Sequence, residues 1–165
     1  MASHEHQAQA RHHLRVGIIT ASDTRTAATD KSGAAIRQML EAAGHTVPSY
    51  EVIPDERARI SAAIAASLPE LDAIIVTGGT GVARRDATIE AVEPMLEKKL
   101  DGFGEIFRML SYQEIGAAAI LSRAVAGICR GKFIAAIPGS TAACRLAMEK
   151  LILPEIGHIA YLLAE

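Results

Sequence analysis

The sequence predicts a three-layer α/β/α sandwich built on a mostly parallel mixed sheet of about five strands. Short apolar runs rich in β-branched residues alternate with segments whose apolar residues recur at helical spacing. Half of the 165 residues are apolar, yet aromatic residues make up only 4% and tryptophan is absent, so the core has to be aliphatic. A chain of this length can bury such a core in one domain.

Charge and hydropathy exclude several classes of function. The net charge is −2 and the arginines are scattered along the chain, so no basic footprint for nucleic acid is present. No window approaches the roughly 18 consecutive apolar residues of a membrane helix, and residues 1–13 lack the apolar core of a secretory signal. We therefore expect a cytoplasmic protein without a membrane partner. Cys129 and Cys144 do not form a CxxC pair, which favours reduced, packing cysteines.

The N-terminal segment, residues 1–13, is polar and shows no apolar periodicity, so we expect a disordered tail. It contains four histidines, and metal binding by these imidazoles is the alternative. A single domain is then predicted over residues 14–165.

The first half of the domain alternates between strands and helices. Residues 16–20 predict a strand, and the amphipathic segment between Asp30 and Gly44 predicts a helix. Residues 46–53 predict the second strand, which Pro54 breaks. An apolar stripe through residues 60–68 predicts the second helix.

The most informative stretch covers residues 71–88. Ala73 to Val76 is an unbroken apolar run that predicts a strand buried on both faces. Three glycines follow it within four positions, at 78, 79 and 81, and allow a ligand to approach backbone N–H groups. Thr88 is expected to cap a helix that starts near Ile89. A tight strand-to-helix turn without a ligand is the alternative reading.

The same loop carries side chains suited to an anionic ligand. Thr77 and Thr80 supply hydroxyl groups, Arg84 and Arg85 supply positive charge, and Asp86 supplies a carboxylate. The pattern matches neither the Walker phosphate loop nor the dinucleotide GxGxxG motif.

The third quarter of the chain is less regular. Residues 89–100 predict a helix that Pro94 kinks or ends near Glu93. Residues 101–112 hold three of the six aromatic side chains, so this helix packs either in the core or at a subunit interface. Residues 117–122 fit a helix or a loop.

The last quarter predicts a hairpin and a helix. Residues 124–129 and 132–137 read as two strands joined by a tight turn at Arg130-Gly131. A second glycine loop, Pro138-Gly139-Ser140-Thr141, follows, and Ser140 or Thr141 can cap a long helix with Pro154 near its middle.

These polar groups are expected at one edge of the sheet, because ligands of open α/β sheets bind outside the carboxyl ends of the strands. The predicted edge collects Ser22-Asp23, Asp55, the stretch from Thr77 to Asp86, and Pro138 to Thr141.

At this point the chain resembles a known family. Its ordered motifs are Thr77-Gly78-Gly79-Thr80-Gly81, Arg85-Asp86-x-Thr88, Gly102-Phe103-Gly104-Glu105 and Pro138-Gly139-Ser140-Thr141. They are similar to those of the molybdopterin-binding proteins of molybdenum-cofactor biosynthesis, the MoaB/MogA type, and more similar to the B branch. One departure is Ile89, where the family pattern usually has proline.

The resemblance implies a homotrimer or homohexamer that binds molybdopterin and, in active members, adenylylates it with ATP and Mg²⁺. It implies catalytic and metal-binding roles for Asp55 and Asp86. It implies substrate binding by Ser22, Asp23, Thr77, Gly78, Gly79, Thr80, Gly81, Arg85, Pro138, Gly139, Ser140 and Thr141.

Three functions remain open from the sequence. The first is a molybdopterin adenylyltransferase, which needs both the glycine loops and the carboxylates. The second is a non-catalytic binder or carrier of molybdopterin, which needs only the loops. The third is a flavodoxin-like or unrelated phosphate-binding module.

Overall fold

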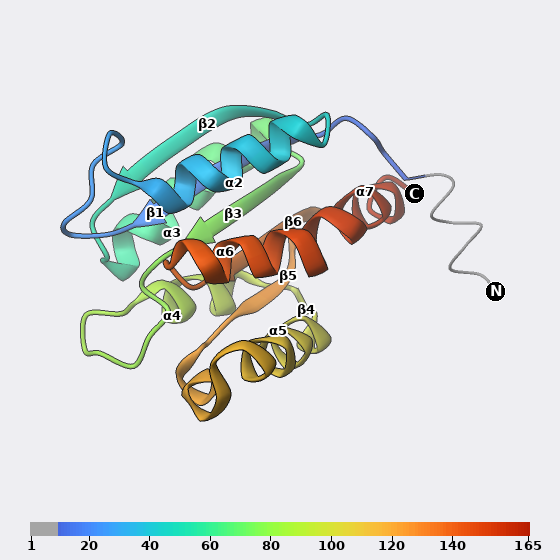
Figure 1. Ribbon diagram of the computed structural model, residues 1–165. Coiled ribbons are helices and arrows are strands. Elements are labelled where there is room, and N and C mark those ends of the chain that lie inside the picture. The colour runs from blue at the N-terminus through green and yellow to red at the C-terminus, as the bar shows by residue number, and fades with distance from the viewer. Residues whose placement is uncertain (1–9) are drawn as a thin grey trace.

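The computed structural model describes residues 10–165, and residues 1–9 of the predicted tail lie outside this range. Figure 1 shows one sheet flanked by helices. The strands are β1 (Arg15–Ala21), β2 (Thr46–Ile53), β3 (Ala73–Thr77), β4 (Lys98–Lys99), β5 (Val125–Cys129) and β6 (Lys132–Ile137). The helices are α2 (Lys31–Ala42), α3 (Arg57–Ser67), α4 (Thr88–Val92), α5 (Asp101–Ile115), α6 (Thr141–Ala147) and α7 (Leu153–Leu162).

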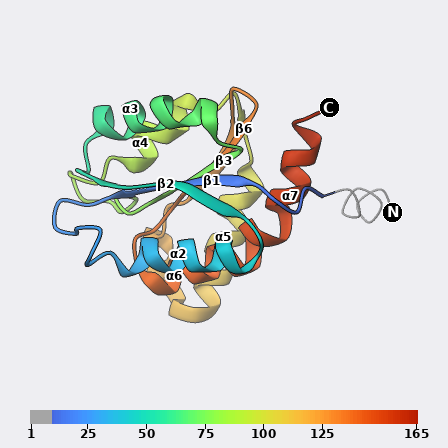
Figure 2. The same cartoon turned by 90° about the horizontal axis from the view of Figure 1, so that it is seen from above.

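The sheet is mixed and mostly parallel, with the order β2-β1-β3-β6-β5-β4. The pairs β1–β2, β1–β3 and β3–β6 are parallel, whereas β5 runs antiparallel to both β6 and β4. In Figure 2, α3 and α4 cover one face, and α2, α5 and α6 cover the other. The predicted fold class is therefore confirmed, with a sixth strand where we expected about five because the two-residue β4 pairs with β5.

Two apolar clusters fill the space between the layers. One joins the sheet to α2, α5, α6 and α7, and the other joins it to α3 and α4. All five residues of β3 are buried, as expected for a central parallel strand. The predicted hairpin is also present, and its turn residues Arg130 (φ 49°) and Gly131 (φ 72°) both have the positive φ that a tight hairpin turn requires.

The boundary predicted near Glu93 is confirmed, but the helix predicted over residues 89–100 does not continue beyond it. The α4 helix ends at Val92, a 3₁₀ turn follows over Glu93–Met95, and Lys98 and Lys99 are a strand. Pro94 has no N–H to continue the helix and disfavours helical geometry at the residue before it. The cap predicted for Thr88 is wrong as well, because Ala87 is the N-cap and the buried Thr88 hydroxyl has no hydrogen-bond partner among the described residues.

The last helix is also interrupted where one long helix was expected. Ser140 caps α6 by accepting a hydrogen bond from the Ala143 N–H, as predicted. A π-helical turn, Met148–Ile152, then separates α6 from α7, and Pro154 lies in the first turn of α7. Proline cannot donate to the carbonyl four residues earlier, and the wider turn accommodates that missing bond.

The aromatic helix α5 has two distinct faces. Phe107 is fully buried in the core, so the core reading holds for this residue. On the other face Ile106, Met109, Tyr112 and Ile115 are exposed by 44 to 64% of their surface. The segment after α5, residues 116–121, is a 3₁₀ helix and resolves the helix-or-loop alternative.

The folded part starts slightly before Leu14, where we expected it to begin. The Arg11 N–H donates to the Gly157 carbonyl at 3.1 Å, and its guanidinium lies 3.2 Å from Asp72 Oδ1. Cys129 and Cys144 are both buried and unbonded to each other. Over residues 10–165, no helix combines the length and apolar character needed to cross a membrane.

Candidate functional site

A cavity of about 430 Å³ opens at the carboxyl edge of the parallel strands. The loops after β1, β2, β3 and β6 form it, and the loops after β1 and β3 project at the left of Figure 1. Its lining residues are Ala21, Ser22, Asp23, Thr24, Arg25, Asp55, Gly78, Gly79, Thr80, Gly81, Asp86, Leu121, Ser122, Pro138 and Gly139. Ten of the fourteen residues singled out from the sequence therefore line one cavity.

The glycine loop after β3 presents bare backbone to this cavity. Gly79 has a φ of 62°, and a Cβ there would lie 2.5 Å from both Asp55 Oδ1 and Thr88 Oγ1. Within residues 10–165, the N–H groups of Gly79, Thr80 and Gly81 donate no hydrogen bond. A loop with three free amides and no Cβ at two of them suits an anionic group.

Arg123 holds this loop from outside the cavity, and sequence reasoning missed it. Its Nε donates to the carbonyl of Thr80 at 2.8 Å, and its Nη2 donates to the carbonyl of Gly81 at 2.6 Å. Glu90 on α4 accepts from Nη1 at 2.6 Å and fixes the guanidinium. The Thr80 carbonyl belongs to the same peptide group as the Gly81 N–H, so Arg123 fixes the orientation of that N–H. The Thr88 N–H donates to the Gly79 carbonyl at 2.9 Å and fixes the orientation of the Thr80 N–H in the same way.

Three carboxylates form what we call the carboxylate side of the cavity: Asp23, Asp55 and Asp86. Asp55 Oδ1 accepts from the Ala87 N–H at 3.1 Å, and Asp86 Oδ2 accepts from the Ala83 N–H at 2.8 Å. Asp23 Oδ1 accepts from the Asp55 N–H at 3.3 Å. The other oxygen of Asp55 and of Asp86 accepts no hydrogen bond from a described residue.

The carboxylate side is electrostatically unfavourable by itself. Burial raises the pKa of Asp55, and the negative charges of Asp86 and Asp23 raise it further, against the opposing effects of the Ala87 N–H and Arg85. A carboxyl group with a raised pKa in a cleft is a candidate functional group. A cation placed among these oxygens would remove the repulsion.

The donor set fits Mg²⁺ that arrives with a substrate. Among the described residues, no three acidic, His or Cys side chains gather into a cage that could hold a metal by itself. Asp55 and Asp86 nevertheless each keep one free carboxylate oxygen at the same cavity. Mg²⁺ is commonly held by one or two carboxylates together with substrate phosphates.

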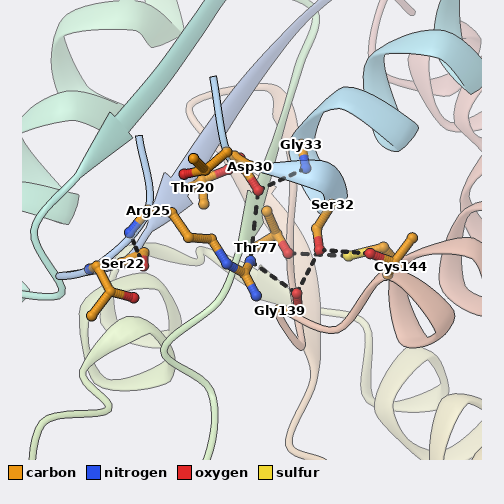
Figure 3. Close-up of polar contacts among 12 residues, drawn as sticks. Thr20, Ser22, Arg25, Asp30, Ser32, Gly33, Thr77, Gly139 and Cys144 are labelled. Atoms are coloured by element: carbon orange, nitrogen blue, oxygen red, sulfur yellow. Dashed lines mark hydrogen bonds and ion pairs between the residues drawn. The ribbon is translucent and has the colours of Figure 1, made fainter. Parts of the chain in front are cut away.

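The arginine side of the cavity comprises Ser22, Arg25 and Gly139. Ser22 Oγ accepts from the N–H groups of Thr24 and Arg25, which folds the loop after β1 into a turn. The Arg25 guanidinium then reaches across the cavity wall, and its Nη1 donates to the Gly139 carbonyl at 3.0 Å. Figure 3 shows this side chain extended between the two loops.

Buried Asp30 holds the Arg25 guanidinium through an ion pair. Its Oδ2 accepts from the Thr20 hydroxyl at 2.6 Å and from the Tyr50 hydroxyl at 2.7 Å. Its Oδ1 lies 3.6 Å from Arg25 Nη1 (Figure 3). Burial alone would raise the pKa of Asp30. The hydrogen bonds from Thr20, Tyr50 and Gly33, together with the charge of Arg25, outweigh burial and lower this pKa below its ordinary value.

Four of the residues singled out from the sequence lie outside the cavity lining. Thr77 is buried and bonds the Pro138 carbonyl at 3.1 Å, and Ser140 caps α6. The Thr141 hydroxyl lies 3.3 Å from that of Ser32. Arg85 is largely exposed and pairs with Asp23 at 2.7 Å. Thr77, Ser140 and Thr141 shape the loops, and Arg85 offsets part of the negative charge.

Sequence reasoning missed Arg25, Asp30 and Arg123 as parts of the site. Arg25 ends the polar run after β1, and its position beside Ser22 was the available signal. Arg123 follows the segment that the sequence left ambiguous, and its partners lie more than 30 residues away, so no local pattern indicated it.

Comparison with known proteins identifies the family of the chain. The sequence profile of a family described as "Probable molybdopterin binding domain" matches residues 17–158. Molybdenum cofactor biosynthesis protein B of Halalkalibacterium halodurans is 52% identical over 162 residues, which cover 96% of this chain and 95% of that protein.

Solved structures of related proteins have the same fold as this chain. A crystal structure of a molybdenum cofactor biosynthesis protein B has a TM-score of 0.91 at 49% identity and covers 94% of this chain and 99% of that one. The tungsten cofactor synthesizing protein MoaB from Pyrococcus furiosus has a TM-score of 0.85 at 37% identity, covering 94% and 100%. The chain belongs to the molybdopterin-binding domain family, within its MoaB branch.

Proposed function

We propose that this member of the MoaB branch binds molybdopterin in the cavity described above and adenylylates it with ATP and Mg²⁺. The observation that carries the proposal is the meeting of two groups in one cavity. Free loop amides are suited to a phosphate, and carboxylates with free oxygens are suited to a metal-bound nucleotide. A pterin carrier needs the first group and has no use for the second.

In the proposed reaction, an oxygen of the molybdopterin phosphate forms a bond to the α-phosphorus of ATP. The bond from this phosphorus to the oxygen that bridges to the β-phosphate breaks, and pyrophosphate leaves with the electron pair. Transfers of this kind depend mainly on positioning and on neutralising charge. Bound Mg²⁺ would supply that neutralisation at the nucleotide phosphates.

The chain's own residues divide the remaining work. The amides of Gly79, Thr80 and Gly81 would donate to phosphate oxygens, with the Gly81 N–H oriented by Arg123 and the Thr80 N–H by the Thr88 contact. Asp55 and Asp86 would hold the metal through their free oxygens. The carboxyl ends of β1, β3 and β6 form the base of the cavity and exclude water from it, since Thr20 on β1 and Thr77 on β3 are fully buried.

The test is to mix the purified protein with molybdopterin, ATP and Mg²⁺ and to follow adenylylated product and pyrophosphate together. Stoichiometric formation of both is the expected result. Binding of molybdopterin without either product, next to an active control enzyme, would refute the transfer step and leave the binding step.

A non-catalytic binder is the second candidate, and one contact favours it. Asp86 Oδ2 accepts from the Ala83 N–H three residues earlier, which is a bond that a purely structural carboxylate makes in a tight loop. In this reading Asp86 shapes the glycine loop and the protein carries molybdopterin without altering it.

The predicted homotrimer or homohexamer has a candidate surface on α5. Ile106, Met109, Tyr112 and Ile115 are exposed on this helix, and Ile120 is 82% exposed in the 3₁₀ segment that follows. Aromatic, Met and aliphatic side chains of this kind are typical of subunit interfaces. Met109→Asp should reduce the mass measured by light scattering, and an unchanged mass would exclude this surface. Phe107 is unsuitable for the test because it lies in the core.

A further inference from the structure

The charges around the cavity are unevenly distributed. Three carboxylates line it, Asp23, Asp55 and Asp86. Among the described residues of the lining, Arg25 has the only cationic side chain. A phosphate that enters without a metal is therefore attracted by one charged side chain of the lining and repelled by three.

Arg25 has donors to spare for such a group. A guanidinium carries five N–H bonds. Only Nη1 of Arg25 is engaged within the described part of the chain, through the Gly139 carbonyl and the ion pair with Asp30. Nε and both hydrogens of Nη2 have no acceptor there. The side chain keeps 35% of its surface exposed, so these donors are accessible from the cavity.

The surroundings hold Arg25 in place before any ligand binds. Asp30 is completely buried and ionised, and Thr20 and Tyr50 fix its carboxylate. The turn closed by Ser22 fixes the backbone of Arg25. A flexible arginine loses side-chain entropy when it binds a ligand, and preorganisation of this kind removes much of that cost.

A neighbouring hydroxyl adds a further donor. Ser22 Oγ accepts two backbone hydrogen bonds, and its own hydrogen has no acceptor among the described residues. Ser22 and Arg25 line the same part of the cavity as Gly139. The loop after β1 thus presents one cation and one hydroxyl to the part of the cavity that Gly139 also lines.

We propose that Arg25, supported by Ser22, binds the terminal phosphate of the pterin substrate and so gives the site its preference for the phosphorylated form. This inference rests on the proposed function. It places the pterin phosphate against the arginine side, where the amides of the glycine loop line the same cavity and can donate to it as well, with an oxygen left to face the carboxylate side, where the nucleotide would bind. Asp30 is then the positioning residue behind Arg25.

The test compares two ligands by isothermal titration, without ATP or metal: molybdopterin, and the same compound after phosphatase treatment. Wild-type protein should bind the phosphorylated form about 10- to 100-fold more tightly, the scale of hydrogen bonds to a charged group. Arg25→Gln should lose most of this preference and keep only the part that the loop amides and Ser22 contribute. Arg25→Lys should recover part of the preference, because a point charge replaces a forked donor.

Arg37→Gln is the matched control, since Arg37 is exposed on α2 and pairs with Glu41 outside the cavity. It should retain the full preference. Thermal melting of each variant separates ligand binding from folding. An Arg25→Gln protein that melts like wild type and prefers the phosphorylated form as strongly as wild type does would overturn the inference, as would a wild-type protein that binds both forms equally. Wild type that binds neither form contradicts the proposed function itself, and the inference falls with it.

Discussion

The carboxyl group behind the arginine side of the cavity and those on the carboxylate side have opposite electrostatic environments. On the arginine side, buried Asp30 receives hydrogen bonds from Thr20 and Tyr50 and an ion pair from Arg25, and its pKa is lowered. On the carboxylate side, Asp55 lies near two further negative charges, and its pKa is raised. The Asp30 carboxylate is satisfied within the folded chain, whereas Asp55 stays close to like charges until a cation arrives.

The difference shows which contacts serve the fold and which serve the ligand. Groups that complete their hydrogen bonds internally stabilise the protein in the absence of substrate. Like charges held together cost stability, and such groups are concentrated at functional sites. We therefore predict a functional role for Asp55 and Asp86 and a structural role for Asp30. Substitutions on the two sides should separate these roles.

The largest effect is expected for Asp86→Asn on adenylyl transfer. The variant keeps an oxygen for the Ala83 N–H and loses the charge that would hold Mg²⁺. Transfer should fall by about 100- to 1000-fold, the usual scale for removing one group that stabilises transition-state charge. Molybdopterin binding, measured by titration on the same preparation, should be unchanged or slightly tighter. Full activity would assign Asp86 to the structural class together with Asp30.

Asp30→Asn should destabilise the protein without ligand. An amide can accept fewer hydrogen bonds than a carboxylate and cannot pair with Arg25, so the unfolding free energy should fall by about 2 kcal/mol. In a domain of this size that corresponds to a decrease in Tm of about 4 to 8 °C. Because the folded pKa of Asp30 lies below the ordinary value of 3.8, its stabilisation is present above that pH and is lost as the pH falls through the folded pKa. The deficit of the variant should therefore shrink in acid.

Arg123→Gln tests whether the glycine loop needs its outer support. Glutamine cannot span the carbonyls of Thr80 and Gly81 together with Glu90. Molybdopterin affinity should fall by about tenfold, equivalent to about 1.4 kcal/mol. Arg108→Gln, on the neighbouring helix α5, provides a control for the loss of a nearby positive charge. Equal losses in both variants would point to long-range charge and not to the hydrogen bonds.

Asp55→Asn should give the smallest change in stability, and this change should be opposite in sign to that of Asp30→Asn. The folded pKa of Asp55 is raised, so its ionisation costs stability as the pH rises above 3.8, and the cost is constant above the folded pKa. At neutral pH the variant should melt at a higher temperature than wild type, and in strong acid the two should converge. Adenylyl transfer should fall at the same time. A variant that melts lower at pH 7 would show that the Ala87 contact outweighs the repulsion.

The sequence by itself determined the alternation of strands and helices, the hairpin and the gathering of polar loops at one edge. Each of these follows from local signals: apolar runs such as Ala73 to Val76, glycines at the loops, and the rule that parallel strands share a carboxyl edge. Motif order along the chain was sufficient to indicate the family. Proline positions indicated where helices end, but not which structure follows, as the strand at residues 98–99 shows.

Only the tertiary structure decided which side chains complete the site. Asp30 meets Tyr50 across 20 residues, Arg123 meets Thr80 across 43, and Arg25 meets Gly139 across 114. Such pairs depend on how strands are ordered in the sheet and on which loop folds over its neighbour. The same holds for α5, where Phe107 is buried and Met109 is exposed in one apolar segment. Residue type and spacing set the local conformation, whereas burial and long-range hydrogen bonds arise only when distant segments pack together.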